Sequence, residues 1–176
     1  DLKVKSLKPD AIIHSAAISN QHPHIIFAKN NNIPILSRAK AIDFICKISN
    51  KKTIAVTGSH GKTTVSSLIT EILINAKQDP SFIIGGYLQT LKKNSMFNNG
   101  KYLIIESCES DKSFLELSPD IAIITNIDNE HLGIYQNDIS NLINAFIKFA
   151  LQIKPTGSCI INIDNPYTYR VWQKLK

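Results

Sequence analysis

The segment at residues 53–64 constrains the fold of this chain more than any other. Its sequence, TIAVTGSHGKTT, runs from apolar β-branched residues through a short polar loop into a helical pattern. Glycines let backbone N–H groups approach phosphate oxygens, the following helix points its positive end at them, and a lysine and a hydroxyl reach the terminal phosphate and its Mg²⁺. This order predicts a phosphate-binding loop built on Gly58, Gly61, Lys62 and Thr63.

The loop departs from the general phosphate-loop pattern at one position. That pattern, G-x-x-x-x-G-K-[ST], places a glycine at position 56, where this chain has Val56. The predicted strand before the loop and the predicted helix after it match the context in which the motif works. An ordinary glycine turn between a strand and a helix is the alternative interpretation.

The length and composition allow one well-packed core, or one domain with part of another. The chain has 176 residues, of which 43% are hydrophobic. It begins at Asp1 rather than at a methionine and ends within a helical pattern, so we expect a piece of a longer protein. It has no run of roughly 20 apolar residues and no signal-peptide pattern. We therefore expect a cytoplasmic protein without membrane insertion.

The positive charge does not by itself predict a nucleic-acid partner. The net charge is +6, and the basic residues are 18 lysines and two arginines. Basic surfaces gain affinity by neutralising phosphates, but these lysines are scattered rather than interleaved with aromatic residues along one stripe. We expect no nucleic-acid binding, and a basic nucleic-acid-binding module stays a less favoured alternative.

The apolar pattern predicts an α/β protein with a mainly parallel sheet. Short apolar runs alternate with amphipathic helical patterns, as in a sheet that is buried on both faces. We predict strands at residues 11–14, 33–36, 53–57, 82–84, 102–106, 121–126 and 159–163. We predict helices at residues 23–31, 38–48 and 62–76, and a further one capped by Asp138. Residues 92–101 are predicted to be an exposed loop.

A polar connector at residues 49–52 divides the chain into two parts. The β-α-β-α rhythm before it indicates the end of a Rossmann-like domain, and the strand, loop and helix after it open a P-loop ATPase domain. We therefore predict a first domain at residues 1–50. The second domain is predicted at residues 51–176, incomplete at its C-terminus.

Polar residues follow three of the predicted strands. The phosphate loop follows one strand, Glu106 ends a second, and Asn126 and His131 follow a third. In α/β proteins the carboxyl ends of parallel strands meet at the edge of the sheet where ligands bind. We expect these residues to converge in one active site although they are distant in sequence.

Several segments share their pattern with one known family. They are TGSHGKTT at the loop, YLIIESCESDKSF and SPDIAIITNIDNEHL after later strands, and IIHSAAI and IPILSRA near the N-terminus. These segments resemble the Mur ligases, the ATP-dependent amide-forming enzymes of peptidoglycan synthesis, and their folylpolyglutamate synthase relatives. The two longer segments are similar to the E-A-D-E-S-D-x-S-F and T-N-I-x-x-D-H-L hallmarks of the branch that joins L-alanine to UDP-N-acetylmuramate. The two N-terminal segments resemble the end of the family's UDP-substrate domain.

The resemblance implies a role for each residue of the site. Lys62 would hold the γ phosphate of ATP during transfer, and Thr63 and Glu106 would bind Mg²⁺ as hard oxygen ligands. His131 aligns with the family histidine that binds a second metal. The catalytic residues implied are thus Lys62, Glu106 and His131. The residues that would wrap the ATP phosphates are Gly58, Ser59, His60, Gly61, Lys62, Thr63 and Thr64.

The implied reaction is a ligation through an acyl phosphate, with ATP, UDP-N-acetylmuramate and L-alanine as substrates and Mg²⁺ as cofactor. The muramyl carboxylate attacks ATP and the amine then displaces phosphate, so both steps concentrate negative charge that cations stabilise. The family's N-terminal UDP-binding turn and its C-terminal amino-acid-binding domain are absent from these 176 residues. We therefore expect the isolated chain to be inactive.

Three positions depart from the family pattern. Ser59 replaces a threonine, Cys108 stands where an aspartate is usual, and Glu130 replaces the aspartate before the histidine. Cys108 removes a carboxylate and Glu130 lengthens one, so metal or amino-acid contacts through these two positions are open. These changes give no reason to discard the reaction itself.

Two further functions stay open at this point. One is the family branch that joins a recycled tripeptide to the same muramyl nucleotide, although its acidic segment usually differs from that at residues 109–114. The other is a remnant that binds nucleotide without turnover. Glu109 and Asp111 either orient substrate or belong to a solvated loop, and His60 either contacts phosphate or shapes the turn.

Overall fold

The computed structural model describes residues 2–130 and 132–176, so the predicted site residue His131 lies outside the described residues. The elements in chain order are α1 (Leu2–Leu7), β1 (Ile12–His14), α2 (Pro23–Asn30), β2 (Ile35–Ser37), α3 (Arg38–Ile48), β3 (Lys52–Thr57), α4 (Lys62–Asn75), β4 (Ser81–Leu88), β5 (Lys93–Met96), β6 (Tyr102–Glu106), β7 (Ile121–Ile124), α5 (Ile139–Ala150), β8 (Ser158–Ile161) and α6 (Pro166–Leu175). Two short 3₁₀ helices are η1 (Ser113–Glu116) and η2 (Leu132–Tyr135).

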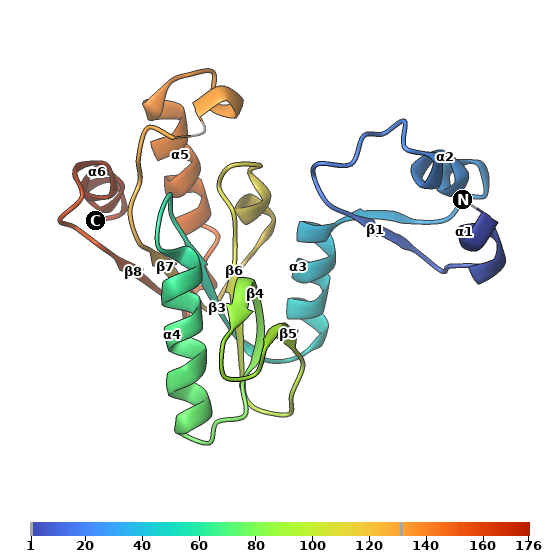
Figure 1. Cartoon of the computed structure of the whole chain (residues 1–176). Helices are drawn as coiled ribbons and strands as arrows, with labels where there is room; N and C mark the ends of the chain where they lie inside the picture. The colour runs from blue at the N-terminus through green and yellow to red at the C-terminus, as the bar shows by residue number, and fades with distance from the viewer. Residues whose placement is uncertain (1, 131) are drawn as a thin grey trace.

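Six strands form the central sheet in the order β5-β4-β6-β3-β7-β8 (Figure 1). All neighbours pair in parallel except β5, which runs antiparallel to β4 at one edge. The central strand β3 pairs on both sides, and its Ile54 is opposite Ile104 of β6 and Ile121 of β7. The predicted α/β class with a mainly parallel sheet is therefore confirmed.

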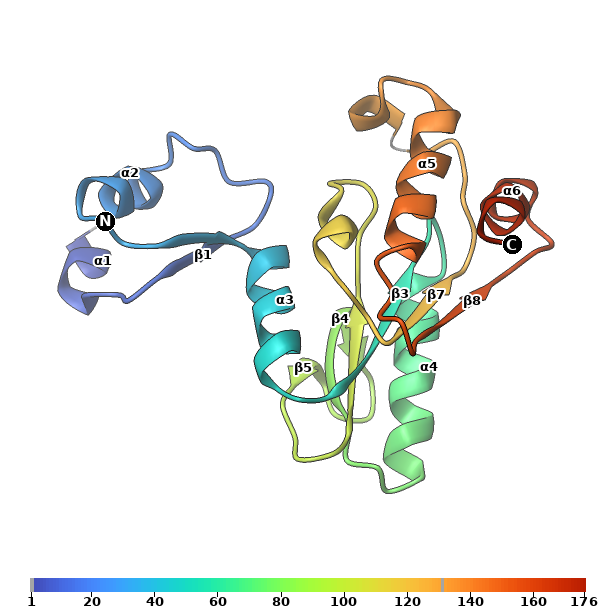
Figure 2. The same ribbon diagram turned by 180° about the vertical axis from the view of Figure 1, so that it is seen from behind.

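Helices cover both faces of this sheet, as the continuous apolar strands require. Alternate residues of β6 face opposite sides: Ile104 packs with Ile69 and Leu73 of α4, whereas Leu103 and Ile105 pack in the core that holds α5. Figures 1 and 2 show α4 and α5 on opposite faces. The two helices thus bury the apolar residues of both faces of the sheet.

The N-terminal part of the chain forms a separate two-stranded parallel sheet. Ile12 of β1 is opposite Ile35 of β2, and this small unit lies to one side of the central sheet (Figures 1 and 2). Ser37 caps α3, which joins the two parts and packs its residues Ile42 and Ile45 against the main core. The division into domains at residues 1–50 and 51–176 stays a prediction.

The observed helix ends confirm the capping predicted from sequence. The carboxylate of Asp138 accepts a hydrogen bond from the N–H of Ser140 at 2.8 Å, and α5 begins directly afterwards. α5 buries Phe146 and Phe149 completely in the core. None of the described helices combines the length and apolar character that crossing a membrane would require.

The prediction that residues 92–101 form a loop is wrong in part, because residues 93–96 form β5. Its first three residues, Lys93, Asn94 and Ser95, are polar and exposed, and only Met96 is apolar and partly buried, so the alternation that normally marks a strand is absent. Backbone pairing with β4, including Ile83 opposite Ser95, determines this strand instead. The short helix α1 was also not predicted, and β4 extends four residues beyond its predicted end.

Candidate functional site

The loop between β3 and α4 depends on its two glycines. Gly58 has φ = +135°, and a Cβ atom there would lie 2.1 Å from Thr125 Oγ1 and 2.8 Å from the carbonyl oxygen of Asn126. Gly61 has φ = +78°, in the left-handed region, directly before the first turn of α4. The loop therefore passes against the end of β7 at a distance that only glycine permits.

The segment after β7 holds the loop through several hydrogen bonds. The N–H groups of Ser59 and His60 donate to the carbonyl oxygen and to Oδ1 of Asn126, at 3.0 and 2.9 Å. Thr125 Oγ1 and Asn126 Nδ2 donate in turn to the carbonyl oxygen of His60, at 2.7 and 3.0 Å. The N–H of Asp128 donates to Ser59 Oγ. Asn126, predicted at this edge from sequence, thus supports the loop.

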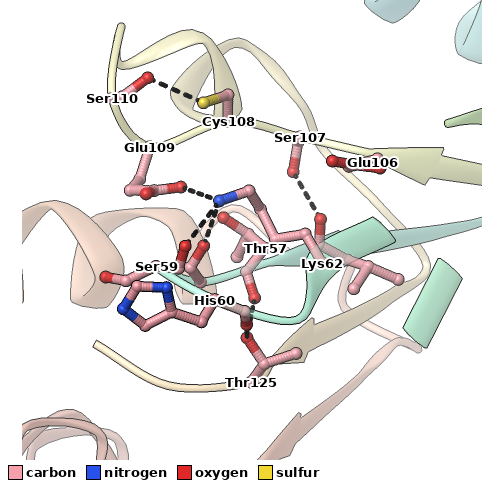
Figure 3. Close-up of polar contacts among 12 residues, drawn as sticks. Thr57, Ser59, His60, Lys62, Glu106, Ser107, Cys108, Glu109, Ser110 and Thr125 are labelled. Carbon is pink, nitrogen blue, oxygen red and sulfur yellow. Dashed lines mark hydrogen bonds and ion pairs between the residues drawn. The ribbon is translucent and has the colours of Figure 1, made fainter. Parts of the chain in front are cut away.

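The side chain of Lys62 folds back over the loop (Figure 3). Its Nζ donates to the carbonyl oxygens of Gly58 and Ser59, at 2.6 and 3.2 Å, and to Glu109 Oε2 at 3.0 Å. The side chains are 14% exposed for Lys62 and 3% exposed for Glu109. A buried lysine–carboxylate pair therefore lies directly at the predicted phosphate loop.

A second polar pair lies beside it at the end of β6. Thr63 Oγ1 donates to Glu106 Oε1 at 2.9 Å, and the N–H of Gly85 donates to Oε2 at 2.6 Å. A Cβ atom at Gly85 would lie 2.5 Å from Glu106 Oε1, so glycine permits this approach. Among the described residues no group of three or more His, Cys, Asp or Glu side chains could hold a metal ion. Thr63 and Glu106 bring two hard oxygen atoms together at this end of the sheet.

Tyr135 in η2 positions the loop that carries Glu109. Its hydroxyl donates to the carbonyl oxygen of Glu109 at 2.5 Å, and the tyrosine is 2% exposed. Burial, followed by the negative charge of Glu109, raises the pKa of Tyr135, so the phenol stays protonated as a donor. The ammonium of Lys112 lies 4.9 Å from the centre of the same ring.

Two of the three residues that depart from the family pattern, Cys108 and Glu130, lie at the rim of the site, whereas Ser59 lies within the loop. Cys108 is half-buried, with its Sγ 2.9 Å from Ser110 Oγ. It lines a cavity of about 490 Å³ between the N-terminal part and the central sheet, together with Ser15 and Arg38. Glu130 is exposed, and its Oε1 lies 3.8 Å from His60 Nε2.

The structure brings together most residues predicted for the site, and their roles stay predictions. Lys62, Thr63 and Glu106 converge at the carboxyl ends of β3 and β6, as expected from the parallel sheet. Sequence reasoning did not find Gly85 or the contact of Tyr135. A glycine within an apolar strand was the available signal for Gly85, since it often marks a close approach of another group.

Comparison with known proteins now places this site in a family. The model of the Mur ligase middle domain matches residues 56–176, which include the phosphate loop and the acidic segment after β6. The chain belongs to the Mur ligase family. It is 43% identical over 155 residues to the UDP-N-acetylmuramate–L-alanine ligase of Aquifex aeolicus, covering 88% of this chain and 34% of the relative. The chain spans about a third of the length of the curated relatives it matches.

Solved Mur ligase structures share the fold. The UDP-N-acetylmuramate–alanine ligase of Thermotoga maritima superposes with a TM-score of 0.82 at 28% identity, over 93% of this chain and 37% of that one. The UDP-N-acetylmuramate:L-alanyl-gamma-D-glutamyl-meso-diaminopimelate ligase of Neisseria meningitides gives a TM-score of 0.84 at 18% identity, over 98% and 58%. The second likeness shows the fold alone, so it does not distinguish between the branches of the family.

Proposed function

We propose that the complete polypeptide containing this chain joins L-alanine to UDP-N-acetylmuramate at the expense of ATP, in a cytoplasmic step of peptidoglycan synthesis. The sequence similarity to relatives that carry this name supports the choice of substrates. The observation that carries the proposal is the convergence of Lys62 with the Thr63–Glu106 pair at one edge of the sheet. A lysine, a hydroxyl and a carboxylate in this order suit the transfer of a phosphoryl group.

The phosphate loop binds the β and γ phosphates of ATP in this proposal. The backbone N–H groups at the start of α4 and the positive end of that helix favour an anion here. Lys62 supplies the mobile positive charge, and it neutralises the γ phosphate while the muramyl carboxylate attacks. The loop residues assigned to nucleotide binding are Gly58, Ser59, His60, Gly61, Lys62, Thr63 and Thr64.

The oxygen pair of Thr63 and Glu106 fits Mg²⁺. This ion is usually held by one or two protein oxygens together with substrate phosphates and waters, and the two oxygens lie 2.9 Å apart beside the loop. When bound, Mg²⁺ supplies positive charge that offsets the charge of the phosphates. We propose His131 as a ligand of a second metal ion, on the strength of its position in the sequence motif alone.

The two parts of the chain have separate tasks in this proposal. Residues 1–50 belong to the domain that binds UDP-N-acetylmuramate, and residues 51–176 belong to the central ATP-binding domain. In such a division the groups that select the amino acid lie largely outside these 176 residues. The isolated chain is therefore expected to lack ligase activity, and substantial alanine-dependent ATP turnover by it would contradict this expectation.

Phosphate release by the complete polypeptide tests the proposed function. The assay supplies Mg-ATP and UDP-N-acetylmuramate, and adds L-alanine, L-serine, glycine or the L-alanyl-γ-D-glutamyl-meso-diaminopimelate tripeptide in turn. Preference for L-alanine supports the proposal, and preference for the tripeptide assigns the protein to the recycling branch instead. ATP binding without turnover on any acceptor would indicate a remnant that has lost the reaction.

A further inference from the structure

We propose that Glu109 is a positioning residue for Lys62, and that nucleotide binding makes Lys62 exchange this carboxylate for a phosphate oxygen. The inference rests on the proposed function, because it takes residues 58–64 as the site of the ATP phosphates. It adds a residue outside the phosphate loop that controls where the loop lysine lies before nucleotide arrives.

The contacts of Lys62 leave no free donor for an incoming phosphate. An ammonium group has three N–H donors, and Lys62 Nζ has three acceptors: the carbonyl oxygens of Gly58 and Ser59 and the carboxylate of Glu109. A phosphate oxygen can therefore bind Nζ only if one of these contacts breaks. The choice of which contact breaks depends on charge.

The contact with the Glu109 carboxylate is the one that breaks when a phosphate oxygen binds Lys62. A phosphate oxygen on Nζ would lie within a few ångströms of the Glu109 carboxylate, and two negative groups at that separation repel strongly where water is excluded. Glu109 is 3% exposed, so solvent screens this repulsion poorly. The two carbonyl oxygens are neutral and carry no comparable penalty.

Lys62, rather than Glu109, is the partner that moves. The backbone of Glu109 is fixed from behind by the hydroxyl of Tyr135, which is itself buried. The preceding residue, Cys108, accepts hydrogen bonds at its carbonyl oxygen from Ser113 Oγ and from the N–H of Phe114, both at 3.1 Å. The ammonium of Lys62, by contrast, ends a long flexible side chain, and its two other contacts are with the carbonyl oxygens of Gly58 and Ser59.

The affinity of the complete polypeptide for Mg-ATP tests this exchange by calorimetric titration. In Glu109→Gln the amide oxygen can still accept a hydrogen bond from Lys62, but it carries no charge to compete with phosphate. We expect Mg-ATP to bind about tenfold more tightly than to the wild type, since the exchange no longer separates a buried ion pair. Glu109→Asp, which keeps the charge but withdraws the carboxylate from Nζ, should bind more tightly by a smaller factor.

Glu130→Gln provides the matched control for charge. It makes the same chemical change beside the same loop, but Glu130 is exposed and lies near His60 instead of Lys62. We expect its Mg-ATP affinity to stay within about twofold of the wild type, because water screens an exposed charge. Unchanged or weaker binding in Glu109→Gln, or an equal gain in Glu130→Gln, would overturn the proposal.

Structures of the wild type with and without a non-hydrolysable Mg-ATP analogue, which keeps the γ phosphate, provide a test that needs no variant. The distance from Lys62 Nζ to Glu109 Oε2, 3.0 Å here, should exceed 4 Å when the nucleotide is bound. A contact that persists beside bound phosphates overturns the exchange even in a protein that ligates alanine. A protein that shows the exchange but turns over no acceptor would instead refute the proposed function and leave the role of Glu109 standing.

Discussion

Two lysine–carboxylate pairs lie at opposite ends of the central sheet and differ in how they are held. At the carboxyl ends of the strands, Lys62 meets Glu109 at 3.0 Å. At the amino ends, Lys154 meets Asp120 at 2.9 Å. The distances are nearly equal, so the difference lies in burial and in the other partners of each carboxylate.

Asp120 is tied to the backbone of the sheet. Its Oδ2 accepts from the N–H and from Oγ1 of Thr53, at 2.8 and 2.9 Å, and thus joins the start of β7 to β3. Partial burial opposes ionisation, but these hydrogen bonds and the charge of Lys154 together lower the pKa of Asp120. The Asp120 carboxylate therefore stabilises the sheet through Thr53, and the exposed Lys154 adds a further ion pair to it.

Glu109 has no comparable backbone clamp on its carboxylate. Among the described residues, Lys62 is the one hydrogen-bond partner of that group, and both side chains are largely buried. A carboxylate fixed by backbone donors supports the fold, whereas one held by a flexible lysine leaves that lysine able to change partners. The comparison teaches that an ion-pair distance alone does not separate a structural pair from a functional one.

The largest expected effect is a difference in ligase turnover between substitutions of Lys62 and of Lys154. Lys62→Ala should lower ligase turnover by about a thousandfold, because it removes a charge that stabilises the transferred phosphoryl group. Lys154→Ala should leave turnover within about twofold, since the exposed lysine lies at the opposite edge. Steady-state phosphate release by the complete polypeptide measures both, and equal losses in the two variants would break the comparison.

Substitution of Asp120 should lower the stability of the fold and leave nucleotide binding unchanged. Asp120→Ala leaves the buried N–H of Thr53 without its acceptor, so we expect the free energy of unfolding to fall by about 2–3 kcal/mol. The affinity for Mg-ATP should not change. Urea denaturation followed by circular dichroism measures the first quantity and calorimetric titration the second. A large loss of nucleotide affinity would show that the two edges are not independent.

Loss of the Tyr135 hydroxyl, which binds the backbone of Glu109, should lower stability less than loss of the Asp120 carboxylate. Tyr135→Phe removes the hydroxyl that donates to the carbonyl oxygen of Glu109, at almost constant volume. We expect the free energy of unfolding to fall by about 1–2 kcal/mol, the usual cost of one buried acceptor without its donor. Thermal unfolding of the variant beside the wild type checks this, and a fully stable variant would remove the tyrosine from the description of the site.

The pH dependence gives the smallest and most specific effect. Since the folded protein lowers the pKa of Asp120 below its ordinary value of 3.8, ionised Asp120 stabilises the fold above that pH. This contribution is lost as the pH falls below 3.8 and through the lowered pKa. The stability difference between the wild type and Asp120→Ala should therefore shrink in acid, as urea denaturation at pH 7 and pH 3 would show. A constant difference would assign the effect to packing.

The sequence predicted the fold well wherever local signals agreed. The helix at residues 38–48 was predicted at its observed bounds from its amphipathic pattern, and the structure adds the Ser37 cap before it. Strand β6 was likewise predicted at its observed bounds, because its apolar residues end at a charged one. Strand β5 was missed because three of its four residues are polar and exposed, so pairing with β4 and not apolar alternation determines it.

The site was predictable in its motifs and not in its contacts. Lys62, Thr63 and Glu106 follow glycine and strand signals that can be recognised in the sequence. The pairing of Lys62 with Glu109 joins residues 47 positions apart, and the bond from Tyr135 to Glu109 spans 26. Such contacts depend on the register of the sheet and on the path of the loops, which no local pattern determines.

Hydrogen–deuterium exchange of the complete polypeptide, with and without Mg-ATP, tests most directly whether the carboxyl edge of the sheet binds nucleotide. Slower exchange is expected at residues 58–64 and 106–109, because phosphates order the loop and the strand ends around it. Residues 118–121 and 153–158, at the opposite edge, should exchange at unchanged rates. Protection at that opposite edge, or none at residues 58–64, would contradict the assignment of the phosphate loop.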